Sequence, residues 1–246
     1  MDADAVETVA ILCGGRGTRL REHTQAIPKG LVEVGARPIL WHIVQIYAAQ
    51  GFGRVVLCTG YKGEMIDEFV AAESWPASVD VTCVDTGLDT PTGGRLHRAR
   101  DHLGPGTFCA TYGDGVADID LARLLRFHRD HGAVGTITVV RPELQFGVTE
   151  LNGDGRVRGF QEKPRSDHWI NGGFFCFEPG VFSYLEEDSV LEREPLERLA
   201  ADGELRAYRH EGFWDCMDNY KDAILLNDLW SSGTPPWRVW DEEQAE

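Results

Sequence analysis

A glycine-rich segment carrying two arginines, GGRGTRL at positions 14–20, is the part of the sequence best suited to bind phosphate. It directly follows the apolar run at 9–13, which has the composition of a buried strand. Backbone N–H groups crowded into a glycine loop can bind an anion, and Arg16 and Arg19 place positive charge beside them. The segment therefore predicts a phosphate-binding loop at the end of a strand. A glycine turn that only joins a strand to a helix is the simpler alternative.

Two better-known phosphate-binding loops do not occur in the sequence. A Walker loop requires GxxxxGK followed by Ser or Thr, and no such run is present. The dinucleotide fingerprint GxGxxG fails because Leu20 stands where a third glycine would follow Gly15 and Gly17. That failure, with no evident hydride-transfer site, disfavours a Rossmann-type dehydrogenase.

Carboxylates and a lysine follow other strand-like segments. Asp114 comes just after the run at 108–112, Glu162 and Lys163 follow a later strand candidate, and Asp218 follows GFWDCM. Taken singly, each has a structural explanation, as a turn aspartate, a surface turn or a helix N-cap. Taken in order after the glycine loop, they predict a nucleotidyl transfer site, with cations for the phosphates and two aspartates for Mg²⁺.

The elements that would carry these residues alternate between helical periods and short β-rich runs. The sequence predicts helices at 39–50, 62–72 and 120–131, and strands near 55–58, 81–84 and 108–112. Strands separated by helices of this length predict an α/β fold with a doubly wound, mostly parallel sheet. Ligands of such sheets bind beyond the carboxyl ends of the strands, where the glycine loop and Asp114 fall.

The second half of the chain has a different pattern of predicted elements. After about residue 134 the strand candidates lie close together, and a helix near 191–201 and a strand at 205–210 follow. This spacing favours a mixed sheet with a small antiparallel insertion. No Pro/Ser-rich linker separates a second unit, so we expect a single domain over residues 1–246.

Composition limits the partners and the compartment. The 246 residues carry a formal net charge of −16, which disfavours nucleic acid and an anionic membrane because the overall field repels both. The six cysteines form no CxxC pair, which indicates reduced core thiols. No run approaches the ~18 apolar residues of a membrane span, and the acidic start MDADAVET lacks the apolar core of a signal peptide. We therefore expect a cytoplasmic protein.

Eight segments together carry a family resemblance. They are GGRGTRL, PKGLVEVGARPILWHI, GYKGEMI, VDTGLDTPTGGRL, TYGDGVADID, FQEKP, INGGFF and EGFWDCMDNYKD, in this order along the chain. On these motifs the chain resembles the sugar-1-phosphate nucleotidylyltransferases, and within them the glucose-1-phosphate cytidylyltransferases. The resemblance implies a Rossmann-like nucleotidyltransferase fold. It also implies a reaction of an NTP, here CTP, with a sugar 1-phosphate, here glucose 1-phosphate, to give an NDP-sugar and pyrophosphate.

The resemblance also implies roles for individual residues. The nucleotide is expected at Leu12, Gly14, Gly15, Gly17, Thr18, Thr92, Gly93 and Arg95. The sugar phosphate is expected at Tyr112, Glu162, Lys163, Asn171 and Gly172. Mg²⁺ is expected at Asp114 and Asp218, and the reacting phosphates at the catalytic cations Arg19, Lys29 and Lys163.

The chemistry of the implied reaction fits this set of cations. The second pKa of a sugar phosphate lies near ~6, so the attacking oxygen is mostly ionised at neutral pH and needs no general base. The barrier comes from bringing two anions together and from charge building on the departing pyrophosphate, which lysines, arginines and a metal can stabilise. We therefore assign no acid or base residue.

Three questions stay open from the sequence. Another pyrimidine triphosphate, another hexose 1-phosphate and a non-catalytic nucleotide-sugar sensor are alternatives. Asp215 stands where the family usually has glutamine, and the segment between Trp75 and Val84 is much shorter than usual. A homo-oligomer is also expected, because tryptophans at 214, 230, 237 and 240 could cover either the sheet or a second subunit.

Overall fold

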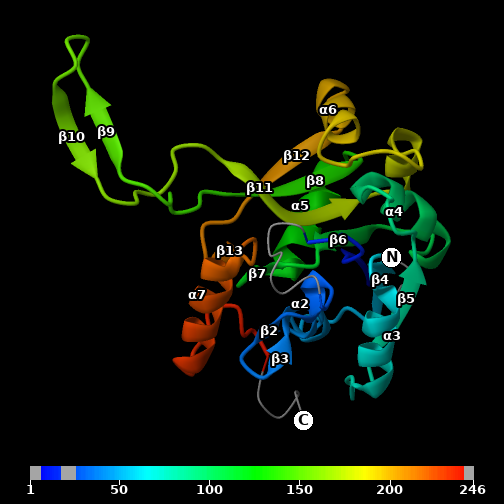
Figure 1. Ribbon diagram of the computed structural model, residues 1–246. Coiled ribbons are helices and arrows are strands. Elements are labelled where there is room, and N and C mark those ends of the chain that lie inside the picture. The colour runs from blue at the N-terminus through cyan, green and yellow to red at the C-terminus, as the bar shows by residue number, and fades with distance from the viewer. Residues whose placement is uncertain (1–6, 18–25, 241–246) are drawn as a thin grey trace.

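A seven-stranded sheet forms the centre of the molecule (Figure 1). The computed structural model describes residues 7–17 and 26–240. The strand order is β12-β8-β11-β6-β1-β4-β5, and β11 runs against the other six strands. The strands are β1 (Thr8–Leu12), β4 (Arg54–Thr59), β5 (Asp80–Asp85), β6 (Phe108–Tyr112), β8 (Gly135–Val140), β11 (Ile170–Phe177) and β12 (Leu205–Arg209). The predicted mixed, mostly parallel α/β sheet is confirmed.

Helices cover both faces of the sheet, which is why its central strands are apolar throughout. Alternate residues of β1 belong to two core clusters, Val9 and Ile11 to one, Ala10 and Leu12 to the other. The first face is covered by α2 (Ile39–Ala48), α3 (Gly63–Ala72), α5 (Leu121–His131) and α7 (Tyr220–Ser231). The second face is covered by α4 (Thr92–Ala99), α6 (Glu194–Ala201) and the 3₁₀ segment η4 (Pro179–Tyr184). The sheet is therefore doubly wound.

The strand order determines where a ligand can bind. The chain builds the sheet outward from β1 through β4 to β5, and then returns to the other side of β1 at β6. In open α/β sheets such a reversal leaves a crevice beyond the carboxyl ends of the two strands at which the direction changes. Here these strands are β1 and β6, which deliver the glycine loop and Asp114.

Small ribbons and turns complete the crevice. The 3₁₀ turn η2 (Lys29–Leu31) leads into the ribbon of β2 (Glu33–Val34) and β3 (Arg37–Pro38). A second ribbon pairs β7 (Gly115–Ala117) with β13 (Trp214–Cys216). A further 3₁₀ turn, η3 (Arg100–His102), directly follows α4. The β2–β3 ribbon is a local hairpin, whereas the β7–β13 ribbon joins segments that are distant in the sequence.

Helix α5 begins and ends where the sequence predicts. The carboxylate of Asp120 accepts a hydrogen bond from the N–H of Arg123 at 2.8 Å, and Gly132 ends the helix with a φ of 64°.

Helix α4 begins earlier than expected. The sequence suggested that Arg95 opens this helix, but its first residue is Thr92, so Gly93 and Gly94 lie inside it. Glycine is needed there because the chain near Glu187 packs against the helix. A Cβ on Gly94 would lie 2.0 Å from the carbonyl oxygen of Glu187.

The C-terminal tryptophans pack within the chain. Trp237 and Trp240 are buried, and Trp230 stacks on Trp237. The indole N–H of Trp237 donates to Nδ1 of the buried His42, whose Nε2 lies 2.9 Å from the carbonyl oxygen of Val34. Burial lowers the pKa of His42 to about 4, so this histidine is neutral. The homo-oligomer prediction loses the support of these buried tryptophans and stays a prediction.

One hairpin projects from the body of the molecule as an arm (Figure 1). It consists of β9 (Val148–Leu151) and β10 (Val157–Gln161), which pair antiparallel and lie outside the central sheet. Its large apolar side chains are exposed, with Phe160 at 62%. The predicted antiparallel insertion is confirmed.

Within the described ranges 7–17 and 26–240, no helix has the length and apolar character needed to cross a membrane.

Candidate active site

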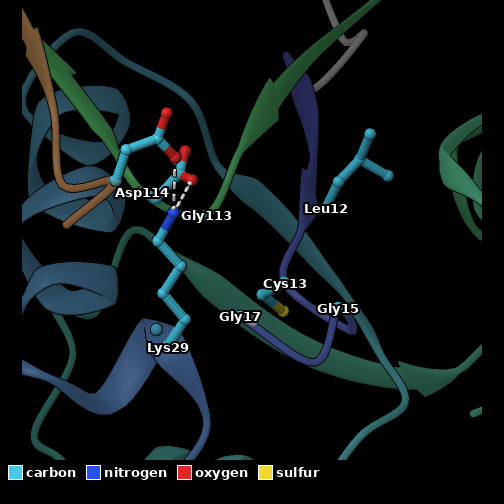
Figure 2. A pocket seen from close by; sticks show the side chains of 9 residues that line it. Leu12, Cys13, Gly15, Gly17, Lys29, Gly113 and Asp114 are labelled. Carbon is cyan, nitrogen blue, oxygen red and sulfur yellow. Dashed lines mark hydrogen bonds and ion pairs between the residues drawn. The ribbon is translucent and has the colours of Figure 1, made fainter. Parts of the chain in front are cut away.

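A cavity of about 290 Å³ lies at the carboxyl ends of β1 and β6 (Figure 2). Six residues predicted from the sequence line it, namely Leu12, Gly15, Gly17, Lys29, Asp114 and Asp218. They come from four separate segments, which the fold brings to one place. Thr18 and Arg19, also predicted here, lie outside the described residues.

The glycine loop after β1 is shaped by contacts from behind. The carbonyl oxygen of Gly14 accepts hydrogen bonds from the N–H of Tyr61 at 3.0 Å and from Arg95 at 2.9 Å. A Cβ on Gly14 would lie 2.1 Å from the Arg95 guanidinium, so this approach requires glycine. Gly17 has a φ of 59°, in the region where glycine is unstrained. The N–H of Gly15 donates to no acceptor in the described part of the chain and is available to an anion.

Arg95 supports this loop from inside the protein. Its guanidinium is buried and donates to the carbonyl oxygens of Gly14, Thr59 and Gly87, and to the hydroxyl of Thr86. These acceptors lie at the ends of β1, β4 and β5, so one side chain ties three loops together. The role of Arg95 in contacting the nucleotide stays a prediction.

Asp114 and Asp218 are brought together by the β7–β13 ribbon. In that ribbon Cys216 pairs with Gly115, and the N–H of Met217 then donates to the carbonyl oxygen of Asp114 at 2.8 Å. The two aspartates therefore lie next to each other at the end of the ribbon. Backbone hydrogen bonds, rather than a contact between the side chains, therefore place the two aspartates side by side.

Helix α7 fixes the backbone on the far side of Asp218. Its N-cap is Asn219, which forms a reciprocal capping box with Asp222. The alternative that Asp218 itself caps this helix is therefore wrong. The carboxylate of Asp222 accepts the N–H of Asp218 at 2.9 Å, and Asp218 itself lines the cavity.

Lys29 bridges the two aspartates. Its ammonium donates to Asp114 Oδ2 at 2.6 Å and to Asp218 Oδ1 at 3.0 Å. Figure 2 shows the lysine extending from its own turn across the cavity to Asp114. Burial lowers the pKa of Lys29, but the two carboxylates outweigh burial and raise the pKa above its ordinary value. Lys29 is therefore a cation held by two anions at the centre of the cavity.

Lys163 lies in a second cavity, of about 760 Å³, at the base of the arm. The lining includes Trp214 and Asp215 from the β13 ribbon and Lys221 from α7. Lys163 has a φ of 45°, a conformation that costs a non-glycine residue about 1–2 kcal/mol. The neighbouring Glu162 packs against Gly147, where a Cβ would come within 2.9 Å of its carboxylate. The structure thus places Lys29 and Lys163 in different cavities.

Asp215 is a half-buried carboxyl group in this second cavity. Its Oδ1 accepts the N–H of Cys216 at 2.8 Å, and no cation of the described residues forms an ion pair with it. Burial raises its pKa to about 6, and the nearby charge of Asp222 adds to this shift.

Glu192 is a residue that the sequence analysis does not single out. Its carboxylate accepts hydrogen bonds from the hydroxyls of Thr92 and Tyr112, and the amide of Asn171 donates to Tyr112 at 3.1 Å. Thr92, expected at the nucleotide, is thus linked through Glu192 to two residues expected at the sugar. Glu192 precedes α6 in a charged segment typical of a helix surface, so no local signal marks it.

The remaining predicted residues lie close to this link. The carbonyl oxygen of Gly172 accepts the indole N–H of Trp214 at 2.7 Å. Gly93 packs under Ser189, where a Cβ would meet the Ser189 carbonyl oxygen at 2.8 Å. Gly93 therefore has a packing reason in the structure, and the ligand contacts of both glycines stay predictions.

The pair of aspartates is chemically suited to a divalent cation. Hard cations such as Mg²⁺ take oxygen ligands, and a site that keeps waters and phosphate oxygens needs one or two carboxylates from the protein. Asp114 and Asp218 provide two that already converge on one positive charge. Within the described residues there is no cluster of three or more acidic, histidine or cysteine side chains that could hold a metal by itself. The residues present therefore fit a metal that arrives with a phosphate ligand.

A family model of nucleotidyl transferases matches residues 8–215, a span that includes the cavity residues from Leu12 to Asp114. The chain belongs to the nucleotidyl transferase family. Enzymes of this family generally use a divalent metal.

Curated relatives extend this comparison to nearly the whole chain. A Bacillus subtilis protein named probable glucose-1-phosphate cytidylyltransferase is 43% identical, with 94% of this chain and 98% of that protein covered. The glucose-1-phosphate cytidylyltransferase of Salmonella typhimurium is 41% identical over the same shares of both chains. The mannose-1-phosphate guanylyltransferase catalytic subunit beta of Drosophila pseudoobscura pseudoobscura is 33% identical, with 87% of this chain and 60% of that protein covered.

Solved structures show the same fold. HddC of Yersinia pseudotuberculosis, in complex with GMP-PN, superimposes with a TM-score of 0.72 at 20% identity, covering 92% of this nucleotidyl transferase and 100% of HddC. A UDP-glucose pyrophosphorylase complexed with UDP-glucose gives a TM-score of 0.72 at 15% identity, covering 93% and 100% of the two chains.

Proposed function

We propose that this enzyme transfers the cytidylyl group of CTP to α-D-glucose 1-phosphate with the help of Mg²⁺, giving CDP-glucose and pyrophosphate. The observation that carries the proposal is the bridge from Lys29 to Asp114 and Asp218, beside the glycine loop in the crevice between β1 and β6. The names of the relatives at 41–43% identity support this choice of base and sugar.

The reaction is a displacement at the α-phosphorus of the triphosphate. An ionised oxygen of the sugar phosphate forms a new P–O bond, the bond between the α-phosphorus and the bridging oxygen breaks, and pyrophosphate leaves with that electron pair. The nucleophile is already an anion at neutral pH, so no protein group has to remove a proton. A bound Mg²⁺ would supply positive charge for the phosphate oxygens from its place at Asp114 and Asp218.

Different residues of the chain bind the triphosphate and the sugar phosphate. The glycine loop offers backbone N–H groups to the triphosphate, and Arg19 adds charge there. Lys29 neutralises phosphate charge near the reacting centre, which lowers the repulsion between the two anions. Lys163, in the cavity at the base of the arm, binds the sugar phosphate together with Glu162, Tyr112, Asn171 and Gly172.

A substrate panel tests the proposal. The purified enzyme is given Mg²⁺, glucose 1-phosphate and one of CTP, dTTP, UTP, ATP or GTP, and the release of pyrophosphate is measured. We expect the highest kcat/KM with CTP. A parallel series with mannose 1-phosphate tests the sugar, and reactions without sugar phosphate set the background.

Each other outcome of the panel contradicts a defined part of the proposal. A preference for another triphosphate overturns the cytidylyl assignment, and a preference for GTP with mannose 1-phosphate would match the 33%-identical relatives instead. If no pair of triphosphate and sugar 1-phosphate releases pyrophosphate, the transferase assignment is wrong, and a nucleotide-sugar binding protein is favoured.

A further inference from the structure

The ammonium of Lys29 lies where a cation bound by both aspartates would lie. Its hydrogen bonds go to Asp114 Oδ2 and Asp218 Oδ1, one oxygen from each carboxylate. We infer that Lys29 keeps divalent metal out of the site until a triphosphate arrives, so that metal and nucleotide bind cooperatively. This inference rests on the proposed function and adds an order of binding to it.

Lysine and metal compete because they need the same oxygens. Two cations cannot share these oxygens without strong mutual repulsion, and the low exposure of the group limits screening by water. The side chains of Lys29, Asp114 and Asp218 are 15%, 24% and 35% exposed. A metal ion binding alone must therefore displace a well-held ammonium.

Among the described residues, the displaced ammonium would find no other anion in the cavity. The described residues that line it include no carboxylate besides Asp114 and Asp218. The lining also includes Gly15 and Gly17 of the glycine loop, which is suited to hold anionic phosphates. A bound triphosphate would thus supply the missing partner for Lys29 inside the same cavity.

The side chain of Lys29 can make this exchange without moving its backbone. The turn that carries it is held by two hydrogen bonds, from Leu31 N–H to Pro28 O at 2.9 Å and from Val32 N–H to Lys29 O at 3.1 Å. The lysine stem is long and flexible, so its ammonium can turn from carboxylates to phosphates by rotamer changes alone. The aspartate oxygens are then free for the metal.

Mn²⁺ binding to the enzyme without nucleotide tests the inference. Mn²⁺ replaces Mg²⁺, and free Mn²⁺ is followed by electron paramagnetic resonance during titration with protein. We expect Lys29→Met to bind Mn²⁺ at least tenfold more tightly than the wild type. Lys221→Met is the matched control, because it removes a lysine three positions after Asp218 whose ammonium is not bonded to either aspartate in the structure. It should bind Mn²⁺ as the wild type does.

A second variant separates charge from folding. Lys29→Arg keeps a cation at the aspartates and should keep Mn²⁺ binding weak, while thermal unfolding reports whether each variant is folded. A non-hydrolysable α,β-methylene analogue of CTP provides the other half of the test. In the wild type it should strengthen Mn²⁺ binding at least tenfold, and in Lys29→Met this gain should shrink.

The outcomes distinguish this inference from the proposed function. If folded Lys29→Met binds Mn²⁺ no more tightly than the wild type, while the wild type still forms a complex with Mn²⁺ and the analogue, the exclusion by Lys29 is wrong and the metal site stands. If neither protein binds Mn²⁺ even with the analogue, the metal site and the proposed function fall together.

Discussion

The two cavities of this enzyme are built in different ways. The crevice cavity lies at the ends of β1 and β6, and its Lys29 is partly buried and paired with two carboxylates. The arm cavity lies among irregular segments around Lys163 and the β13 ribbon, and its Asp215 has no cationic partner among the described residues. In the crevice cavity the ammonium of Lys29 already balances carboxylate charge. In the arm cavity burial raises the pKa of the Asp215 carboxyl group.

This difference matches the proposed division of the reaction. Groups that act on the reacting phosphates must be in place before the chemistry, and positions at strand ends are held rigidly by the sheet. Groups that select a sugar can sit on loops that vary without disturbing the sheet. We therefore expect variants in the crevice cavity to change kcat and variants in the arm cavity to change the KM for the sugar phosphate.

The largest expected effect comes from the crevice. Asp218→Asn keeps the shape of the side chain but removes one of the two charges available to the metal, so kcat with Mg²⁺ should fall by about two to three orders of magnitude. Stability should change little, because Lys29 retains its hydrogen bond to Asp114. Steady-state kinetics and the thermal unfolding midpoint measure the two effects.

The exposed Asp188 offers a control for the loss of one negative charge. Asp188 is exposed and lines neither cavity, so Asp188→Asn should keep wild-type kinetics. Near-normal turnover of Asp218→Asn in Mg²⁺ would show that this carboxylate does not hold the metal, and the contrast between the cavities would lose its basis.

The sequence predicts well whatever depends on neighbours along the chain. Strand β6 occupies 108–112, and α5 runs from the Asp120 cap to His131, as the apolar patterns and the capping residues indicate. Asp114 could be placed at the tip of β6 for the same reason. Where the sequence failed locally, at the start of α4, the cause was the packing of the chain near Glu187 against Gly94, a contact between distant segments.

The contacts that define the site are of this long-range kind. Lys29 reaches partners 85 and 189 positions away, and the link from Thr92 to Glu192 spans 100 positions. No spacing rule covers such distances in a single sequence. The resemblance to a family supplied the candidate site residues, but it could not indicate three features of the structure. These are the pairing of Lys29 with both aspartates, the support of the glycine loop by Arg95, and the link from Thr92 to Tyr112 through Glu192.

The arm cavity predicts a second, smaller kinetic effect. Lys163→Ala removes the cation proposed to bind the sugar phosphate, so the KM for glucose 1-phosphate should rise about tenfold or more while the KM for CTP changes little. The two KM values are measured with the other substrate saturating. A rise confined to the KM for CTP would indicate that Lys163 binds the nucleotide, and the proposed difference between the cavities would be wrong.

Lys163→Gly is a useful companion to this variant. It removes the same charge but relieves the positive φ of this position, so it should share the KM defect and be at least as stable as Lys163→Ala. If the glycine variant regains the wild-type KM, the backbone conformation rather than the ammonium is what the sugar phosphate requires.

The smallest expected effect concerns the unpaired carboxyl group of the arm cavity. Burial raises the pKa of Asp215 from 3.8 in the unfolded chain to about 6 in the folded protein. The folded state therefore binds this proton more tightly, and the stability gained from it is present at low pH and lost as pH rises through about 6. Asp215→Asn, which cannot ionise, should be more stable than the wild type at pH 7.5 by about 1 kcal/mol, a figure discounted for partial exposure.

Urea unfolding at pH 4 and pH 7.5 measures this difference. The advantage of Asp215→Asn should be present at pH 7.5 and largely absent at pH 4, where Asp215 is protonated in the folded wild type. Asp188→Asn, in a solvated position, should show no such dependence. An advantage of equal size at both pH values would mean that ionisation of Asp215 is not the cause, and that the arm cavity neutralises its carboxylate as effectively as Lys29 neutralises Asp114 and Asp218.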